Sequence, residues 1–391
     1  MPRTPTLTAA ERRRRLGRRH RLSPSASATS AAAVADALVG LHATDAATVF
    51  LSVAARTTSC TVQDLEREMY DDVALVRLLA MRNTLFAVTR ELAPYVYAST
   101  ARAIAAKERR TLLKHFAEDD GGLDAAWLEA AEAEVHALLA AHGSASGSEL
   151  SAASDALRTR ITVFPGKKGE TVQGVASRVL RVMAAEGRIR RDRPRGTWTS
   201  SQFRWTASEP WPDLPAAEAK AELTRRWLLS YGPATEADLK WWTGWTLADV
   251  RKALTASAAT EVRLEDGRAA HVAPDDTAPE PETEPWAALL PGLDPSAMGW
   301  ADRGFHLADE HRASLFDRSG NIGPTVWWNG EIVGGWAQRP GGEVVCRLLA
   351  DRGAEATTAV EAEAERLSAW LGRARVTPRF RTPLERELST A

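Results

Sequence analysis

The sequence predicts a mainly helical fold with α+β character: three tandem winged-helix modules followed by a C-terminal α+β unit. Three observations support this prediction. The order of three helices and a two-stranded ribbon occurs three times along the chain. A stretch rich in proline and acidic residues then occupies 273–285, a composition typical of a linker. Beyond it, Asn329-Gly330 stands between two β-rich runs, which is the strongest short-range signal of a β-hairpin.

The first module is predicted over residues 1–115. An arginine-rich helix near its start is followed by an alanine-rich helix and then by an apolar helix that begins after Asp45. A short helix leads into residues 75–88, which we interpret as two strands joined by a turn at Arg82-Asn83. Helices followed by such a ribbon are typical of a winged helix-turn-helix.

The second module is predicted over residues 116–210. A long helix at 124–141 and another at 172–185 lead into a basic wing. The two strands of this wing are expected at 187–191 and 196–199, where β-forming residues alternate with arginines and threonines.

The third module, residues 211–275, has the same order, and Trp241 and Trp242 lie on one of its helices. Aromatic residues at helical positions usually belong to the core, so we assign both to packing. Residues 286–391 form the C-terminal α+β unit, with the hairpin, a third strand and a long helix over 354–372.

Composition limits the classes of protein that the sequence fits. The chain has 391 residues, too many for one ordinary hydrophobic core. No apolar run approaches the roughly 20 residues of a membrane span, and no signal-peptide stretch follows the N-terminal arginines. Cys60 and Cys346 are the only cysteines and lack metal-ligand spacing, and no nucleotide-phosphate loop is present. We therefore expect a cytoplasmic protein with no membrane contact, no metal and no cofactor.

Positive charge is unevenly distributed, although the formal net charge is only −1. One run of arginines lies near the N-terminus and a second lies in the second module, whereas acidic residues gather in the linker. A single basic run is commonly a solvated helix face, but two runs in successive modules favour contacts with nucleic acid phosphates. The residues predicted to contact DNA are Arg12, Arg15, Arg19, Arg82, Lys167, Lys168, Arg188, Arg190, Arg191 and Arg193.

Five segments, taken in order, resemble a known family over nearly the whole chain. They are Leu41-His42-Ala43-Thr44-Asp45, Met81-Arg82-Asn83-Thr84-Leu85-Phe86, Tyr231-Gly232-Pro233-Ala234-Thr235 with Trp241-Trp242-Thr243-Gly244, Leu289-Leu290-Pro291-Gly292-Leu293-Asp294, and Gly320-Asn321-Ile322-Gly323-Pro324-Thr325-Val326. Together they are similar to the AlkZ/YcaQ-like winged-helix DNA glycosylases. The resemblance implies a tandem winged-helix protein that binds duplex DNA and hydrolyses the N-glycosidic bonds of bulky N7-alkylpurines, in some members also unhooking interstrand crosslinks.

The resemblance places the catalytic motif at His42-Ala43-Thr44, where active family members carry Gln-x-Gln or Gln-x-Asp. An N7-alkylguanine is already cationic, so the enzyme needs only to place a water and to stabilise positive charge on the sugar. A neutral imidazole accepts the water's proton, and Thr44 can hold the same water. Because protonated His42 would repel the lesion, excision is expected to fall at acidic pH.

The motif also has structural interpretations. Asp45 precedes an apolar helix and is a good N-cap, a role compatible with charge stabilisation or with orienting His42. A histidine at a helix end is more often structural than catalytic. No lysine lies in the motif, so a Schiff-base step is not expected and the enzyme is predicted to be monofunctional. Asp294, Trp300 and Arg303, in and after the segment Leu289–Asp294, are candidates to face the lesion, although Asp302 beside Arg303 also fits a local ion pair.

Three functions remain open from the sequence. The first is a DNA glycosylase for base-excision repair, with self-resistance to a genotoxic natural product as its setting. The second is a regulator or architectural DNA binder without catalysis, which the missing glutamines favour. The third is a resistance protein that sequesters an alkylating compound. The expected partner is duplex DNA with alkylated bases, and a nucleoid-associated monomer is expected.

Overall fold

The computed structural model describes residues 4–390. The ends of the first and last predicted units, residues 1–3 and 391, lie outside the described residues. The described helices are α1 (Ala9–Arg19), α2 (Ala31–Ala37), α3 (Ala46–Ala54), α4 (Val62–Glu66), α5 (Ala93–Val96), α6 (Arg102–Glu118), α7 (Ala125–His142), α8 (Gly147–Ala153), α9 (Asp155–Arg158), α10 (Ala176–Ala185), α11 (Ala216–Tyr231), α12 (Glu236–Thr243), α13 (Leu247–Ala256), α14 (Arg312–Leu315), α15 (Gly353–Leu371) and α16 (Pro383–Thr390).

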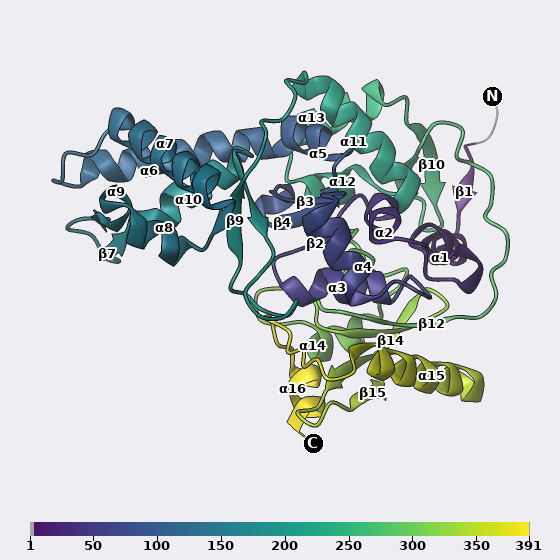
Figure 1. Ribbon diagram of the computed structural model, residues 1–391. Helices are drawn as coiled ribbons and strands as arrows, with labels where there is room; N and C mark the ends of the chain where they lie inside the picture. The colour runs from purple at the N-terminus through teal and green to yellow at the C-terminus, as the bar shows by residue number, and fades with distance from the viewer. Residues whose placement is uncertain (1–3, 391) are drawn as a thin grey trace.

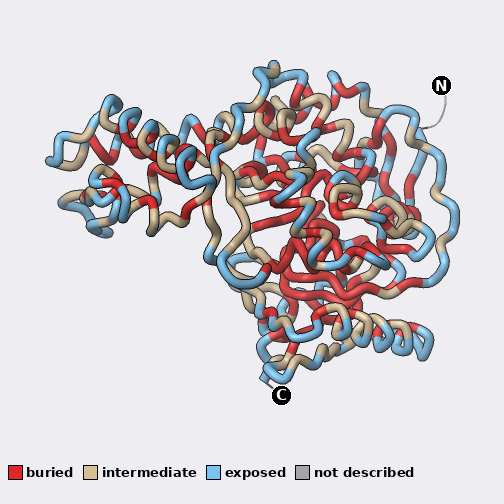
Figure 2. The backbone as a smooth tube through the Cα atoms, viewed as in Figure 1, coloured by how far each residue is buried: buried red, intermediate tan, exposed pale blue. Residues whose placement is uncertain are grey.

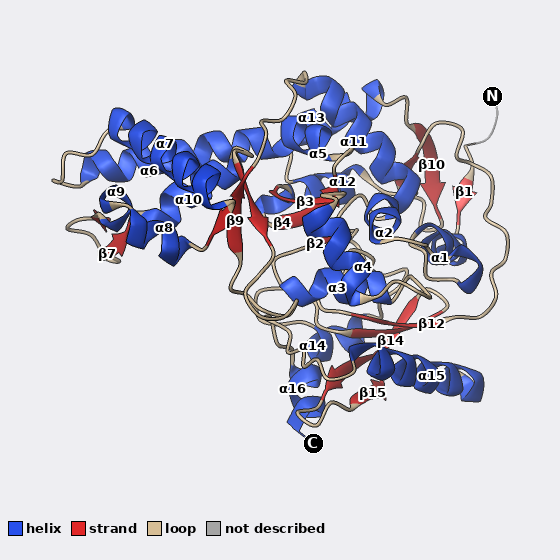
Figure 3. Ribbon diagram, viewed as in Figure 1, coloured by secondary structure: helices blue, strands red, loops and turns tan. Residues whose placement is uncertain are grey.

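The strands are short and belong to small sheets scattered among the helices (Figure 3). They are β1 (Thr6–Leu7), β2 (Leu41–His42), β3 (Leu75–Leu79), β4 (Leu85–Thr89), β5 (Ser144–Ala145), β6 (Arg160–Val163), β7 (Thr171–Gly174), β8 (Ile189–Asp192), β9 (Arg204–Ala207), β10 (Thr260–Leu264), β11 (Ala269–Val272), β12 (Ala287–Leu290), β13 (Thr325–Trp328), β14 (Glu331–Gln338) and β15 (Val344–Leu348). The predicted mixture of helices and strands is confirmed.

The first group of elements comprises α2 to α4 and a three-stranded sheet with the order β2-β4-β3. Local signals fix the helix starts. The Asp45 carboxylate accepts the backbone N–H of Ala47 and caps α3, as the sequence predicted. Thr61 and Asp64 form a reciprocal capping box at the start of α4. β2 lies at the edge of the sheet, so its residue His42 is at an edge as well.

The second group, α6 to α10, forms an arm that projects from the body of the molecule (Figure 1). Its sheet has the order β5-β9-β8, and β6 and β7 form a separate hairpin. The prediction of a wing strand at 196–199 is wrong, because β8 pairs with β9 instead. Trp198 is the reason: its ring stacks on Phe50 with centroids 4.9 Å apart, so this segment anchors the arm to the body.

The third group contains α11 to α13 and the antiparallel pair β10 and β11. β1, which the sequence did not reveal, pairs in parallel with β10. Thr235 and Asp238 form a capping box at the start of α12, and Gly244 ends this helix with a left-handed φ of 76°.

The C-terminal unit is a four-stranded antiparallel sheet in the order β12-β13-β14-β15, accompanied by α15 and α16. The predicted hairpin is confirmed, since Trp328 pairs with Glu331 across the Asn329-Gly330 turn. Asn329 and Gly330 have φ values of 46° and 86°, the left-handed conformation that this turn requires.

Two apolar cores extend across the first group and the C-terminal sheet, the larger of them also into the third group, whereas the arm has a core of its own. The largest core joins side chains of the first group, the third group and the C-terminal sheet, including Phe86, Trp227, Trp242 and Trp327. The arm is filled by a separate cluster that includes Val179. Figure 2 shows the buried backbone concentrated in the body. The body is therefore built by long-range packing rather than by independent units.

Candidate functional site

The motif predicted to be catalytic lies along one edge of the first sheet. His42 on β2 pairs with Phe86 on β4, and the backbone N–H of Ala43 donates to the Leu85 carbonyl at 2.7 Å. Side chains alternate between the two faces of a strand. The His42 ring therefore shares a face with Phe86, whose ring centroid is 5.3 Å away, while Leu85 points to the other face.

The His42 imidazole is buried and neutral. The residue is only 4% exposed, and Nδ1 has no hydrogen-bond partner among the described residues. Burial lowers the pKa of His42 to about 3, and the nearby positive charge of Arg82 contributes to the lowering. A buried nitrogen without a partner costs free energy, so such an atom in a motif position is a candidate to bind a water or a substrate.

Thr44 and Asp45 are held by the C-terminal segment. The Thr44 hydroxyl oxygen is buried without a partner, and its backbone carbonyl accepts from Arg379 at 3.5 Å. Asp45 accepts the backbone N–H of Ala47 through Oδ1 at 3.1 Å and that of Arg379 through Oδ2 at 2.9 Å. Both carboxylate oxygens of Asp45 therefore accept hydrogen bonds from backbone N–H groups. Arg379, which was not predicted from the sequence, holds the motif in place although it lies more than 330 residues further along the chain.

A groove of about 1100 Å³ lies between the arm and the first sheet. Its wall on the side of the first sheet includes Leu79 and Leu85. No aspartate or glutamate is among the described residues that line it. Seven arginines line it: Arg77, Arg158, Arg160, Arg178, Arg181, Arg190 and Arg191. We call this cavity the arginine groove.

Two of the predicted DNA-contacting residues, Arg190 and Arg191, lie in the arginine groove. Arg191 stacks over the Phe203 ring at 3.9 Å, and neither Arg190 nor Arg191 makes an ion pair with a carboxylate among residues 4–390. Burial lowers the pKa of Arg191 to about 10, with Arg77 and Arg379 contributing as like charges. The other groove arginines were not predicted to contact DNA. Arg77 could have been found from the sequence, because it is the one charged residue in the apolar strand 75–79.

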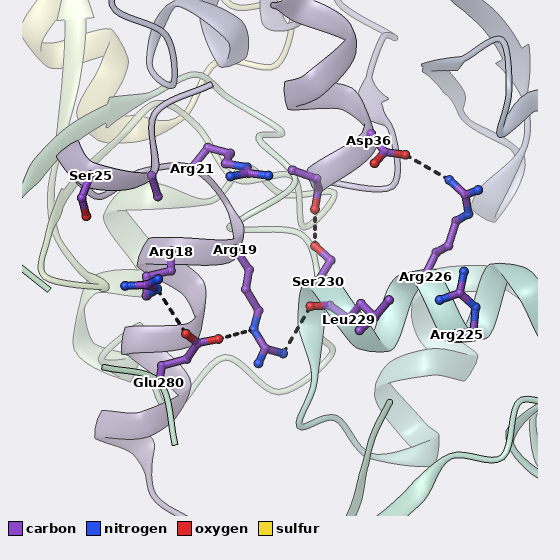
Figure 4. Close-up of a pocket in the computed structure, with 12 residues that line it drawn as sticks. Arg18, Arg19, Arg21, Ser25, Asp36, Arg225, Arg226, Leu229, Ser230 and Glu280 are labelled. Carbon is purple, nitrogen blue, oxygen red and sulfur yellow. Dashed lines mark hydrogen bonds and ion pairs between the residues drawn. The ribbon is translucent and has the colours of Figure 1, made fainter. Parts of the chain in front are cut away.

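The N-terminal arginines have a different environment (Figure 4). Arg19 binds Asp276 at 2.8 Å and Glu280 at 2.9 Å, and Figure 4 shows Arg18 and Arg19 turned toward Glu280. Arg15 is 1% exposed and bonds Glu11, Asp276 and the carbonyl of Ala278. The acidic linker thus neutralises this run, which corrects the expectation that Arg15 and Arg19 contact phosphates.

Arg12 is also buried, 7% exposed, with its guanidinium 3.7 Å from the centre of the Phe305 ring. It makes no ion pair with a carboxylate within the described part of the chain. Burial lowers the pKa of Arg12 to about 10. Its side chain therefore packs in the body rather than projecting toward a ligand.

The remaining residues predicted to contact DNA are either exposed in a loop or bound to glutamates of this chain. Lys167 and Lys168 are exposed in the loop between β6 and β7, outside the residues that line the arginine groove, and Lys167 lies 3.5 Å from the Glu118 carboxylate. Arg188 bonds Glu132 at 2.6 Å within the arm. Arg193 bonds Glu66 at 2.8 Å and thereby connects the arm to the body.

The residues expected to face the lesion are buried. Asp294 is fully buried and paired with Arg56, and Trp300 is 3% exposed with its indole N–H donating to the Tyr231 carbonyl. Both are therefore core residues, which corrects the expectation of a cleft position. Arg303 is 7% exposed, and Asp302 pairs with Arg268 rather than with it.

Within residues 4–390, no group of three or more His, Cys, Asp or Glu side chains is arranged to hold a metal ion. Over the same residues, none of the helices combines the length and the apolar character needed to cross a bilayer.

Comparison with known proteins identifies the family to which this chain belongs. A family model described as DNA glycosylase AlkZ-like matches residues 35–370. The chain therefore belongs to the AlkZ-like family of DNA glycosylases, enzymes of DNA repair that act on DNA.

A solved structure extends this comparison to the whole fold. The Streptomyces sahachiroi DNA glycosylase AlkZ is similar, with a TM-score of 0.70 and 23% sequence identity, and the match covers 96% of this chain and 99% of that chain. At this identity the likeness establishes a shared fold. A comparison with curated proteins found no match.

Proposed function

We propose that this protein is a monofunctional DNA glycosylase that removes N7-alkylguanine, including bulky adducts, from duplex DNA. One observation carries the proposal: in a chain of this family, the motif position holds a buried neutral histidine whose Nδ1 has no partner among the described residues. We further propose that the three groups of helices and small sheets are winged-helix modules. The setting would be protection against a genotoxic alkylating compound.

The proposed reaction is a hydrolysis in which His42 acts as the base. His42 Nδ1 accepts a proton from a water that is also bound by the Thr44 hydroxyl, and the water oxygen bonds to C1′ of the sugar. The electron pair of the C1′–N9 bond moves into the purine and neutralises the positive charge created by the N7 substituent. Asp45 holds the motif in place through its two backbone contacts. Because His42 is only 4% exposed, substrate binding must open a path to Nδ1, and the bound DNA then keeps the ring out of bulk water.

DNA binding is assigned to the arginine groove. Five of its seven arginines make no ion pair with a carboxylate among residues 4–390, whereas Arg158 is paired with Asp155 and Arg181 with Glu108. The unpaired guanidinium groups create a positive potential that attracts phosphates. The groove adjoins Leu85, which faces the opposite side of the first sheet from His42. Since β2 is the edge strand of that sheet, we propose that the duplex extends from the groove around this edge to His42.

Arginines of the arginine groove and arginines paired with acidic residues should respond differently to substitution. Arg191→Gln is expected to weaken duplex binding by about tenfold and to reduce the slope of log affinity against log salt by about one. Arg19→Gln should lower the melting temperature and leave that slope unchanged, because its charge is already neutralised by Asp276 and Glu280. Fluorescence anisotropy at several salt concentrations and thermal melting measure both. Equal salt slopes for the two variants would contradict the assignment of the groove.

The pH profile should reflect the lowered pKa of His42. An ordinary histidine loses its neutral form below about pH 6.5, whereas His42, with a pKa of about 3, stays neutral well below that value. The loss of activity predicted at acidic pH therefore shifts to much more acidic conditions. Single-turnover excision, corrected for spontaneous depurination, is expected to be constant from about pH 7.5 to about pH 5. A titration midpoint near 6.5 would show that the base is an ordinary solvated group.

Excision itself is tested on duplexes that carry one small or one bulky N7-alkylguanine. Abasic sites formed by the protein are detected as strand breaks after mild alkali. Breaks formed without alkali would indicate a lyase step and contradict monofunctional hydrolysis. Binding of the duplex without any abasic site would instead support the non-catalytic DNA binder.

A further inference from the structure

Five side chains are joined by a continuous series of cation–π contacts. The centre of the Trp241 ring is 4.0 Å from the Arg82 guanidinium and 4.9 Å from that of Arg303. Arg303 also lies 5.6 Å from the Phe316 ring, and Arg312 lies 5.0 Å from the same ring. We call the set Arg82, Trp241, Arg303, Phe316 and Arg312 the cation ladder. It joins the β3–β4 turn, α12 and the segment around α14.

The positive charge of the cation ladder is not neutralised. None of its three arginines makes an ion pair with a carboxylate among residues 4–390, and Nε of Arg82 is buried without a hydrogen-bond partner. Arg303 donates only to the Ala297 carbonyl at 2.8 Å and to the Met298 sulfur at 3.7 Å. Most buried arginines elsewhere in the body, such as Arg15 and Arg56, bind carboxylates.

The nearest carboxylates are already engaged by other groups. Asp238 accepts the backbone N–H of Ala301 at 2.9 Å through one oxygen and caps α12 through the other. Asp302 is paired with Arg268. Burial lowers the pKa of Arg82 and of Arg303 to about 10. At Arg303 the charges of Arg312 and Arg82 add to this lowering of the pKa, and those of Asp238 and Asp302 oppose it. Like charges held this close are stabilised by an anion that binds between them.

The cation ladder begins beside the catalytic motif. Arg82 is close enough to His42 to lower the pKa of the imidazole. Phe86, on the same sheet face as His42, meets the Trp242 ring edge-on with centroids 6.2 Å apart, and Trp242 follows the ladder residue Trp241. The far end is open to solvent, since Arg312 is exposed. The arginine groove lies on the opposite face of the first sheet, so it cannot supply charge on the side of His42.

We propose that the two accessible ends of the cation ladder, the exposed Arg312 and the partly buried Arg82, bind phosphates of the DNA strand that carries the target nucleotide, on the His42 side of the first sheet, while the buried Arg303 adds positive charge between them. The guanidinium forks fit phosphodiester oxygens, and the two aromatic rings hold the forks in position without neutralising them. The proposal rests on the proposed function, because it assumes that the target nucleotide lies at His42.

The test measures binding rather than excision. Arg312→Gln and Arg82→Gln remove one charge each, and Arg373→Gln removes an exposed arginine outside the ladder as a control. Each is titrated against an undamaged duplex at several salt concentrations. The same proteins are then titrated against duplexes with one central abasic-site analogue, in which single phosphates near that site are replaced by neutral methylphosphonates. Thermal melting verifies that each variant is folded.

Each ladder variant is expected to bind about tenfold more weakly, with a salt slope smaller by about one. At one phosphate position near the abasic site, methylphosphonate should weaken the wild type and the control but have no further effect on Arg312→Gln. If the variants respond to every methylphosphonate as the wild type does, the cation ladder is a packing feature and the proposal is overturned. If the wild-type protein instead forms no abasic sites in alkylated duplexes, the proposed function fails, while the salt slopes still decide whether the ladder contacts DNA.

Discussion

His42→Ala is expected to reduce the single-turnover rate of N7-alkylguanine excision by about 10²- to 10⁴-fold, the usual contribution of a general base. Its affinity for undamaged duplex should remain close to that of the wild type, because the predicted phosphate contacts lie in the arginine groove and the cation ladder. The rate is measured by alkaline cleavage of the abasic product with enzyme in excess over DNA.

Two further variants give this experiment its controls. His142→Ala removes an exposed histidine at the end of α7 and should leave the rate unchanged. His42→Gln keeps a side-chain oxygen that can hold the water and is expected to retain part of the activity. Unchanged excision by His42→Ala would remove this residue from the mechanism and return it to a structural role.

Asp294→Asn is expected to reduce the free energy of unfolding by about 3–5 kcal/mol, the range found when one partner of a buried ion pair is neutralised. The side chains of Asp294 and Arg56 are both 0% exposed, and the Asp294 carboxylate accepts hydrogen bonds from Arg56 at 2.7 and 2.9 Å. Ser52 adds a hydrogen bond of 2.7 Å to the same carboxylate. The substitution leaves the Arg56 charge buried without compensation. Urea unfolding measures the loss.

A surface pair provides the matched comparison for this prediction. Glu387→Gln breaks the ion pair with Arg347, whose side chains are 59% and 42% exposed, and should cost less than about 1 kcal/mol. Burial raises the pKa of Asp294, but the charge and hydrogen bonds of Arg56 outweigh it and keep the pKa below its usual value. The pair therefore stabilises the fold above about pH 4 and loses this effect as the pH falls through the folded pKa. Similar losses for the two variants would contradict the role assigned to the buried pair.

Local sequence signals predicted most of the helices and the C-terminal hairpin. The N-cap Asp45, the start signal Thr61 and the Asn329-Gly330 turn act within a few residues, so they are readable without a fold. The wing strand at 196–199 was wrong for the opposite reason. Trp198 packs against Phe50, nearly 150 positions earlier in the chain, and this distant contact overrode the local β-pattern.

The candidate site was predicted only in part. His42 and Arg82 were predicted from motifs, and the structure places them close enough for the Arg82 charge to act on the imidazole. Arg190 and Arg191 were predicted from a basic run, and both line the arginine groove. Arg77 was missed because it is a single arginine in an apolar strand, and Arg379 because the C-terminal segment that holds it carries no motif. Their positions depend on how the strand and the C-terminal segment fold back on the rest of the chain.

The sequence by itself determined the helix starts, the tight turn, the family motif and the number of arginines. Only the tertiary structure decided which of those arginines keep a free charge. Arg15 and Arg19 meet Asp276 about 260 residues further along the chain, whereas Arg191 and Arg303 meet aromatic rings. The physical reason is that a counter-charge acts over a few ångströms in space, and the fold alone determines which residues come that close.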